Sequence, residues 1–194
     1  MSDSNPASTT ATPAAETPAA ETPAETAVDT RAGKYLTFAL ADEGYGIEIM
    51  KVREIIGVME ITRVPRTPPH VVGVVNLRGQ VISVVDLRSK FDMPTAEKSD
   101  ETCIIVAETQ RNGRKVSTGL IVDRVSEVLD IAEAQIDDAP QFAGEIDTGF
   151  IRGMGKVGDA EKGGEQEVKI LLDIDAILDA DTEADAAEET PLAA

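Results

Sequence analysis

An internal repeat is the feature of this 194-residue sequence that most limits how it can fold. The segment 46–56 (GIEIMKVREII) matches the segment 119–129 (GLIVDRVSEVL) at a constant offset of 73 residues. The identical positions are Gly46 and Gly119, Val52 and Val125, and Glu54 and Glu127. Apolar residues occupy most of the other matched positions, so the same supersecondary unit occurs twice in the chain.

Three further blocks follow in the same order in both copies. Ile61-x-x-x-Pro65 matches Ile136-x-x-x-Pro140 at offset 75, Leu77-Arg78-Gly79 matches Ile151-Arg152-Gly153 at offset 74, and 84–91 matches 171–178 at offset 87. The jump from 74 to 87 predicts a 13-residue insertion in the second copy, around 158–166. Each copy spans about 60–70 residues, near the lower limit for an independent core. We therefore expect the two copies to pack on each other or to exchange strands.

The pattern of apolar and turn-forming residues in the repeats predicts an all-β fold. Short runs rich in Val and Ile are bounded by Gly, Pro, Asn and Asp, which is the pattern of strands between turns. Examples of these runs are 71–75, 81–85, 103–106, 120–122 and 168–172. Arg111-Asn112-Gly113 between two such runs predicts a hairpin. Many short strands with little helix indicate barrels or a sandwich.

Composition sets the boundaries of the folded part. Residues 1–33 are mostly Ala, Thr, Pro, Glu and Ser, which cannot bury enough apolar area to offset chain entropy, so a disordered tail is expected there. Residues 181–194 form a second, acidic tail, although a short helix could begin at Ile174. The folded domain is therefore expected over 34–180, as two β-barrel subdomains.

Charge and residue usage disfavour several functions. The chain has 18 Lys and Arg against 36 Asp and Glu, a formal net charge of −18, of which −8 falls on 34–178. Such a surface repels nucleic acid and anionic membranes. His70 and Cys103 are the only residues of their types, so no metal site, cofactor site or nucleophilic triad is indicated. We expect a cytoplasmic, non-catalytic protein without a signal peptide or membrane span. An OB- or SH3-like nucleic-acid-binding domain is the alternative.

A glycine motif in the second copy could suggest a nucleotide site. Residues 153–158 (GMGKVG) fit Gly-x-Gly-x-x-Gly. A dinucleotide fingerprint needs a preceding strand, a following helix and a later acidic residue. A Gly-rich acidic segment follows here instead, so we interpret the match as a coincidence.

Two repeated polar positions allow both a structural and a functional interpretation. Glu54 is the last residue of a Val-x-Glu phrase in the first copy, and Arg78 lies in the Asn-Leu-Arg-Gly turn between two apolar strands. Glu54 could brace a strand end, and Arg78 could be a solvated turn charge. Alternatively the carboxylate pairs with Arg78 and orients it for recognition, since arginine offers a planar fork of donors.

Together these phrases resemble the CheW coupling proteins of bacterial and archaeal chemotaxis. The matching segments are 45–49 (YGIEI), 51–55 (KVREI), 73–79 (GVVNLRG), 85–91 (VDLRSKF), 119–125 (GLIVDRV) and 153–155 (GMG). The resemblance covers about 34–180, nearly all of the chain between the expected tails. Its combination of phrases is specific, although each phrase alone would be weak.

The resemblance implies two tandem SH3-like five-stranded β-barrels with short connecting helices. It implies an adaptor that links methyl-accepting chemotaxis receptors to the histidine kinase CheA in membrane-associated arrays, through the receptor's cytoplasmic tip and the kinase's regulatory domain. It assigns Val52, Glu54 and Arg78 to receptor recognition. It assigns Ile49, Ile55, Val122 and Val125 to an apolar groove between the barrels. It assigns Gly73 and Val81 to the kinase contact. No cofactor, metal, nucleic acid or membrane insertion is implied.

Overall fold

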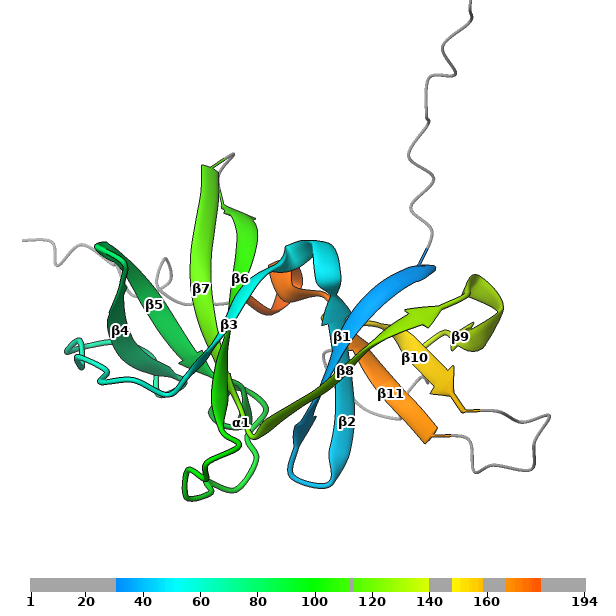
Figure 1. The fold of residues 1–194 in the computed structure, drawn as a ribbon, viewed down its shortest axis with the longest axis horizontal. Helices are drawn as coiled ribbons and strands as arrows, with labels where there is room; N and C mark the ends of the chain where they lie inside the picture. The colour runs from blue at the N-terminus through cyan, green and yellow to red at the C-terminus, as the bar shows by residue number, and fades with distance from the viewer. Residues whose placement is uncertain (1–30, 112–113, 140–147, 159–166, 179–194) are drawn as a thin grey trace, which may run out of the picture.

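Two β-barrels lie side by side in the computed structural model, which describes residues 31–111, 114–139, 148–158 and 167–178 (Figure 1). In chain order the elements are β1 (Gly33–Leu40), β2 (Glu43–Glu48), η1 (Ile49–Lys51), β3 (Val52–Gly57), β4 (Val71–Leu77), β5 (Gln80–Asp86), α1 (Leu87–Lys90), β6 (Cys103–Arg111), β7 (Arg114–Val122), β8 (Arg124–Ile131), η2 (Glu133–Gln135), β9 (Ile136–Asp137), β10 (Ile151–Val157) and β11 (Glu167–Leu172). Residues 174–178 are helical, as expected. The expected tails lie almost entirely outside the described residues.

Barrel 1 has the strand order β3-β6-β7-β5-β4, and barrel 2 has the order β8-β1-β2-β11-β10-β9. The predicted all-β class is confirmed. The sixth strand of barrel 2, β9, is only two residues long. Barrel 1 has a single bridge between Thr62 and Val74 at the same place, so the two barrels share one plan.

The first strand of each repeat joins the barrel that is built mainly from the other repeat. β2 lies in barrel 2, and after η1 the chain crosses into barrel 1 as β3. β7 lies in barrel 1, and after Asp123 the chain crosses into barrel 2 as β8. The expected exchange of strands is therefore confirmed. Because each barrel needs a strand from the other copy, neither copy can complete its sheet alone.

The exchanged strands join their host barrels in the same register. Gly46 on β2 lies opposite Leu171 on the parallel strand β11, and Gly119 on β7 lies opposite Val84 on the parallel strand β5. These pairs match within the repeat at offsets of 73 and 87. Parallel neighbours need a long crossover connection. Here the connection from β5 to β7 contains α1 and β6, and the connection from β2 to β11 contains all the strands of barrel 1 and strands β8 to β10.

The structure corrects one block of the predicted repeat alignment. The predicted match of 77–79 with 151–153 is wrong, because Gly73 is the counterpart of Gly153. Each of these glycines lies at a bulge where its strand pairs with the next strand of the barrel. A Cβ on Gly153 would lie 2.8 Å from the carbonyl oxygen of Asp137, and a Cβ on Gly73 would collide with that of Thr62. The chain passes over the glycine in both barrels, which explains the residue type.

The corrected alignment also divides the predicted insertion. The offset rises from 75 to 80 before β10 and from 80 to 87 before β11. The predicted single insertion of 13 residues around 158–166 is therefore wrong, and two shorter insertions replace it. Residues 140–147 and 159–166, where these insertions fall, lie outside the described residues.

One hydrophobic core lies between the barrels and belongs to both. Its buried members come from β1 and β2, from β5 to β7, from β11 and from the C-terminal helical turn, and they include Leu36, Phe38, Ile47, Leu87, Leu120 and Leu172. Smaller clusters fill the interior of each barrel. Four aromatic rings stack along this boundary, in the order Phe38, Tyr45, Phe91 and Phe150, with centroids 5.3–5.9 Å apart. The two copies thus also pack on each other, as expected.

An ion pair of opposite polarity secures each crossover. At the β2–β3 crossover, Lys51 Nζ lies 2.5 Å from an Asp175 carboxylate oxygen. At the β7–β8 crossover, Arg88 Nε donates to Asp123 Oδ1 over 2.8 Å. Arg88 and Asp175 occupy matched positions after the last strands of their copies, at offset 87. The partners on the other side, Lys51 and Asp123, are one position apart in the repeat, because Lys51 matches Arg124 and Asp123 matches Met50.

Candidate functional site

The hairpin between β4 and β5 presents Arg78 at its tip. Arg78 and Gly79 both have positive φ, 52° and 85°, as a two-residue type I′ turn requires. The side-chain oxygen of Asn76 accepts a hydrogen bond from the Gly79 N–H over 2.9 Å. The Asn-Leu-Arg-Gly phrase thus specifies the turn: the asparagine side chain binds the glycine N–H, and the arginine side chain extends from the tip.

Arg78 and Glu54 form the predicted ion pair. Arg78 Nη2 lies 2.9 Å from Glu54 Oε2, and the side chains are 79% and 19% exposed. Both residues line a small cavity of about 110 Å³ at the end of barrel 1, together with Leu77, Gln80 and Ile82. Of the two interpretations of Glu54, pairing with the turn arginine is therefore confirmed. The pair leaves most of the guanidinium accessible to a partner.

The third predicted receptor-side residue lies apart from this pair. Val52 begins β3 opposite Ala107 and packs against the core shared by the barrels. Val52 is half-buried. A bulge separates it from Glu54, which lies nearer the end of the barrel. The structure therefore brings Glu54 and Arg78 together and leaves Val52 nearer the barrel boundary.

The four predicted groove residues fall into three environments. Val122 is 1% exposed and belongs to the shared core. Ile49 and Val125 pack against that core while remaining partly exposed. Ile55 faces outward on β3. Only Ile49 and Val125 therefore combine an accessible surface with a position at the boundary between the barrels.

The two predicted kinase-side residues differ sharply in exposure. Val81 on β5 is 66% exposed, which is unusual for valine in a strand. Gly73 is buried at the β4 bulge beneath Thr62. The surface that a partner could contact is therefore Val81, while Gly73 shapes the strand beneath it.

Sequence reasoning missed a symmetry among the exposed apolar residues. Val168 on β11 is exposed at the position that matches Val81, and Val128 on β8 is exposed at the position that matches Ile55. The offsets of 87 and 73 could have found both. Met50, which is 90% exposed on η1, was also missed. A methionine within an apolar run carries no local signal of exposure.

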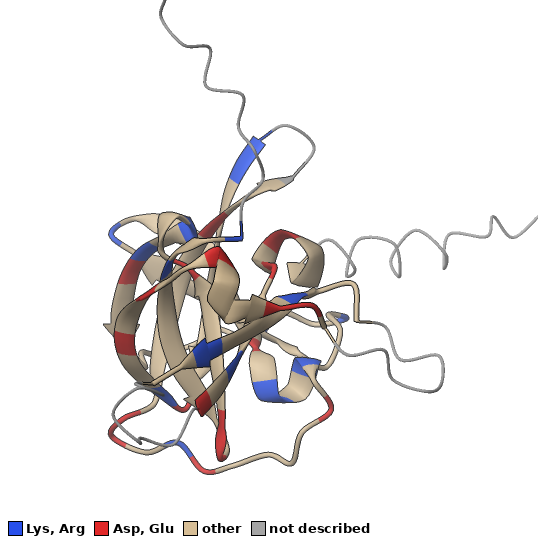
Figure 2. Cartoon of the chain, turned by 90° about the vertical axis from the view of Figure 1, so that its right-hand side faces the viewer, with Lys and Arg blue, Asp and Glu red and all other residues tan. Residues whose placement is uncertain are grey.

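Charge is divided unequally between the barrels. The barrel 1 segment 52–122 has ten Lys and Arg against eight Asp and Glu, a net charge of +2. The segments 33–51 and 123–178, which include barrel 2, have seven against 17, a net charge of −10. Basic and acidic positions are interspersed along the described strands (Figure 2). The two barrels therefore share one plan but differ in charge, so barrel 2 attracts basic partners more strongly than barrel 1 does.

The described residues provide little for catalysis or nucleotide binding. Among them no group of three His, Cys, Asp or Glu side chains could hold a metal ion. The residues 153–157 of the Gly-x-Gly-x-x-Gly match lie within strand β10 and not in a turn between a strand and a helix, and the segment 159–166 after them lies outside the described residues. This agrees with treating the motif as a coincidence. In the described part of the chain, no helix is both long enough and apolar enough to cross a membrane.

Comparison with known proteins decides the family. The family model described as "CheW-like domain" matches residues 34–182. The chemotaxis protein CheW of Klebsiella aerogenes is 37% identical over 150 residues, which cover 77% of this chain and 84% of that protein. The chain belongs to the CheW family. A probable chemotaxis protein CheW of Rhizobium etli is 32% identical over 152 residues, covering 78% of this chain and 90% of that protein.

A solved CheW structure has the same architecture. The crystal structure of the scaffolding protein TtCheW from Thermoanaerobacter tengcongensis superposes with a TM-score of 0.64 at 36% identity, covering 75% of this chain and 92% of that one. CheW proteins are non-catalytic scaffolds, so this chain is a chemotaxis adaptor and not an enzyme. Membership of the CheW family also decides against the alternative of a nucleic-acid-binding domain.

Proposed function

We propose that this CheW-family adaptor couples the cytoplasmic tips of methyl-accepting chemotaxis receptors to the regulatory domain of the histidine kinase CheA. The proposal places the chain in the cytoplasm, beside receptor arrays at the membrane. The observation that carries it is the match to CheW over 34–182, which spans both barrels, supported by the scaffolding role named for TtCheW. The adaptor acts by geometry, since a shift in one bound partner changes the contacts available to the other.

The Arg78–Glu54 pair is our candidate for receptor recognition. Glu54 holds a largely exposed guanidinium at a rigid hairpin tip, so little side-chain entropy is lost when a partner binds. Ile49 and Val125 supply accessible apolar surface at the barrel boundary, and Val52 packs beside them. Val122 supports that boundary from within the core. Ile55 lies outside this set, on the outer face of β3.

Val81 is our candidate for the kinase contact. It presents an exposed apolar side chain on β5, and the neighbouring strand β4 is shaped by the bulge at Gly73. Apolar side chains that are desolvated at the centre of an interface carry much of its binding energy. This position lies on the same hairpin as Arg78, so kinase and receptor contacts would share one rigid element.

Co-purification of the full chain with a receptor cytoplasmic fragment and the CheA regulatory domain tests the proposal. We expect capture of both partners, and capture of neither would overturn it. Arg78→Glu is expected to reduce receptor capture, with Lys34→Glu as the matched control. Lys34 also forms an exposed ion pair, 3.1 Å from Asp130, but in barrel 2. Equal effects of the two reversals would remove Arg78 from the receptor assignment.

The kinase assignment has its own matched control within the repeat. Val81→Glu is expected to reduce capture of the CheA regulatory domain, whereas Val168→Glu places the same charge at the matched position of barrel 2. If Val81→Glu leaves kinase capture intact, or Val168→Glu weakens it equally, the contact is not specific to barrel 1 and the assignment fails.

A further inference from the structure

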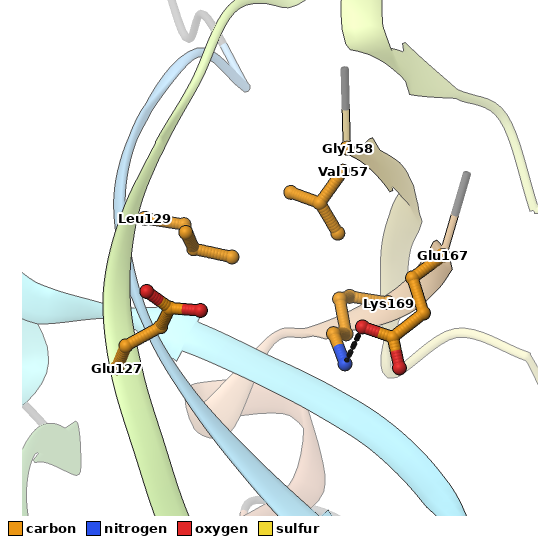
Figure 3. A pocket seen from close by; sticks show the side chains of 6 residues that line it. All are labelled: Glu127, Leu129, Val157, Gly158, Glu167 and Lys169. Carbon is orange, nitrogen blue, oxygen red and sulfur yellow. Dashed lines mark ion pairs between the residues drawn. The ribbon is translucent and has the colours of Figure 1, made fainter. Parts of the chain in front are cut away.

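Barrel 2 has an open cavity at the end that matches the Arg78–Glu54 end of barrel 1. Its volume is about 470 Å³, and the described residues that line it are Glu127, Leu129, Val157, Gly158, Glu167 and Lys169. The side chains of Glu127 and Lys169 face each other across the space, with Leu129 and Val157 along its walls (Figure 3). The cavity therefore combines the Glu127 carboxylate with apolar surface and with the ion pair of Glu167 and Lys169.

The repeat matches five of the six lining residues with residues that line the barrel 1 cavity, and the sixth, Leu129, matches Ile56, which does not line it. Glu127 matches Glu54 at offset 73, Val157 and Gly158 match Leu77 and Arg78 at offset 80, and Glu167 and Lys169 match Gln80 and Ile82 at offset 87. Glu54, Leu77, Arg78, Gln80 and Ile82 line the cavity of about 110 Å³ in barrel 1, together with Arg53, Val106 and Ser117. The two cavities are thus the same site in the two copies.

Two substitutions between the copies open the site in barrel 2. Gly158 stands where barrel 1 has Arg78, so this position supplies no guanidinium to Glu127. Lys169 replaces the buried Ile82, and its Nζ is held 2.8 Å from Glu167 Oε2. Within the described residues, the Glu127 carboxylate has no ion-pair partner, whereas Glu54 has Arg78. Glu54 is therefore paired with a cation, whereas the Glu127 carboxylate is paired with none among the described residues.

We propose that the barrel 2 cavity receives an arginine side chain from a protein partner, whose guanidinium pairs with Glu127 as Arg78 pairs with Glu54. Leu129 and Val157 would contact the methylene stem, while the planar fork suits a carboxylate better than an ammonium does. Because the barrel 2 segments carry a net charge of −10, a basic partner is also attracted at long range. This inference deepens the proposed adaptor function. It rests on that function in one respect only, namely that the partner is a protein.

Heteronuclear NMR titration of the full chain tests the proposal with a defined probe, N-acetyl-arginine N-methylamide. We expect saturable shifts at the backbone amides of Leu129, Val157, Gly158 and Lys169. The uncharged citrulline analogue should bind at least about tenfold more weakly, because hydrogen bonds to a charged partner are stronger by that order. Equal binding of the two analogues, or no shifts at these amides, would overturn the proposal.

Variants locate the site and use barrel 1 as an internal standard. Glu127→Gln should weaken binding about tenfold, whereas Asp130→Asn, which removes a charge from the same strand, should leave it within twofold. Arg78→Ala should open a second site, with new shifts around Glu54 and Leu77. Binding that persists in Glu127→Gln, or no second site in Arg78→Ala, would overturn the analogy between the copies. The titration contains neither kinase nor receptor, so its failure would leave the proposed function standing.

Discussion

Gly119 lies opposite Val84 on the parallel strand β5, and an alanine Cβ at 119 would lie 2.8 Å from Cγ2 of Ile104 on the other side. Gly46 repeats this relationship opposite Leu171, where a Cβ would lie 3.0 Å from Leu171 Cδ2. A glycine therefore lies at the position where each exchanged strand pairs with the parallel strand of its host barrel. Close approach of packed side chains explains why the repeat holds glycine at both positions.

Gly119→Ala should lower the free energy of unfolding by about 1–3 kcal/mol, because the added methyl group overpacks the interior of barrel 1. Urea unfolding measures the change. Gly57→Ala is the control, since a Cβ there meets no atom within 4 Å. Its effect should be within about 1 kcal/mol and stabilising, through the reduced entropy of the unfolded chain. Equal losses in the two variants would contradict the packing argument.

Asp123 should make stability depend on pH in the acid range. Burial acts to raise the pKa of Asp123, but hydrogen bonds from Arg88 and from the Ala41 N–H outweigh it, and the net shift is downward. Its contribution is therefore present above the unfolded value of about 3.9 and is lost as pH falls through the lower folded pKa.

Asp123→Asn should accordingly cost about 2 kcal/mol at neutral pH, and the difference from wild type should shrink below about pH 4. Urea unfolding across a pH series measures both values. The exposed Asp130 serves as the control, since its pair with Lys34 should contribute less than about 1 kcal/mol. A cost for Asp123→Asn that stayed constant down to low pH would show that the carboxylate charge is not responsible.

Arg78→Ala should change the free energy of unfolding by less than about 1 kcal/mol, because the arginine of this ion pair is exposed to solvent and screened. Thermal unfolding measures it, with Leu87→Ala as the contrast. Leu87 is fully buried in the shared core, so its truncation should cost about 2–5 kcal/mol. A large loss of stability in Arg78→Ala would mean that reduced partner binding by Arg78 variants reflects unfolding.

Both tyrosines should ionise late in the native protein. Burial raises the pKa of Tyr45, with a further contribution from Glu43, and burial also raises that of Tyr35 despite the opposing effect of Arg152. The tyrosinate absorbance of the native protein should therefore rise above pH 10, and in urea it should return to a midpoint of about 10.

The same shift predicts alkaline destabilisation. The unfolded chain loses its tyrosine protons first, so stability falls as pH rises from about 10 through the folded pKa values. Unfolding measured at several alkaline pH values checks this slope. A native titration that coincides with the titration in urea would show that the two rings are not held in the buried stack and core where the structure places them.

Much of the candidate site could be predicted from the sequence because its information is local. The Asn-Leu-Arg-Gly phrase specifies its own turn, since asparagine braces a glycine at positive φ. The pairing of Arg78 with Glu54 followed from two charged residues within one repeated unit. Exposure was harder to predict. Val122 and Gly73 are buried although both were expected at binding surfaces, because strands that pack both on a barrel interior and on the shared core give no simple inside–outside alternation.

By itself the sequence determined the class of the fold, the existence of two matched units, their dependence on each other and the family. The repeated pattern of apolar residues, glycines and turns records these features residue by residue. Only the tertiary structure decided which barrel each strand joins, that Gly73 and not Gly79 is the counterpart of Gly153, and that one barrel end is closed while its twin is open. Those outcomes depend on pairing between distant segments of similar sequence, where register and packing choose between partners that local patterns leave equivalent.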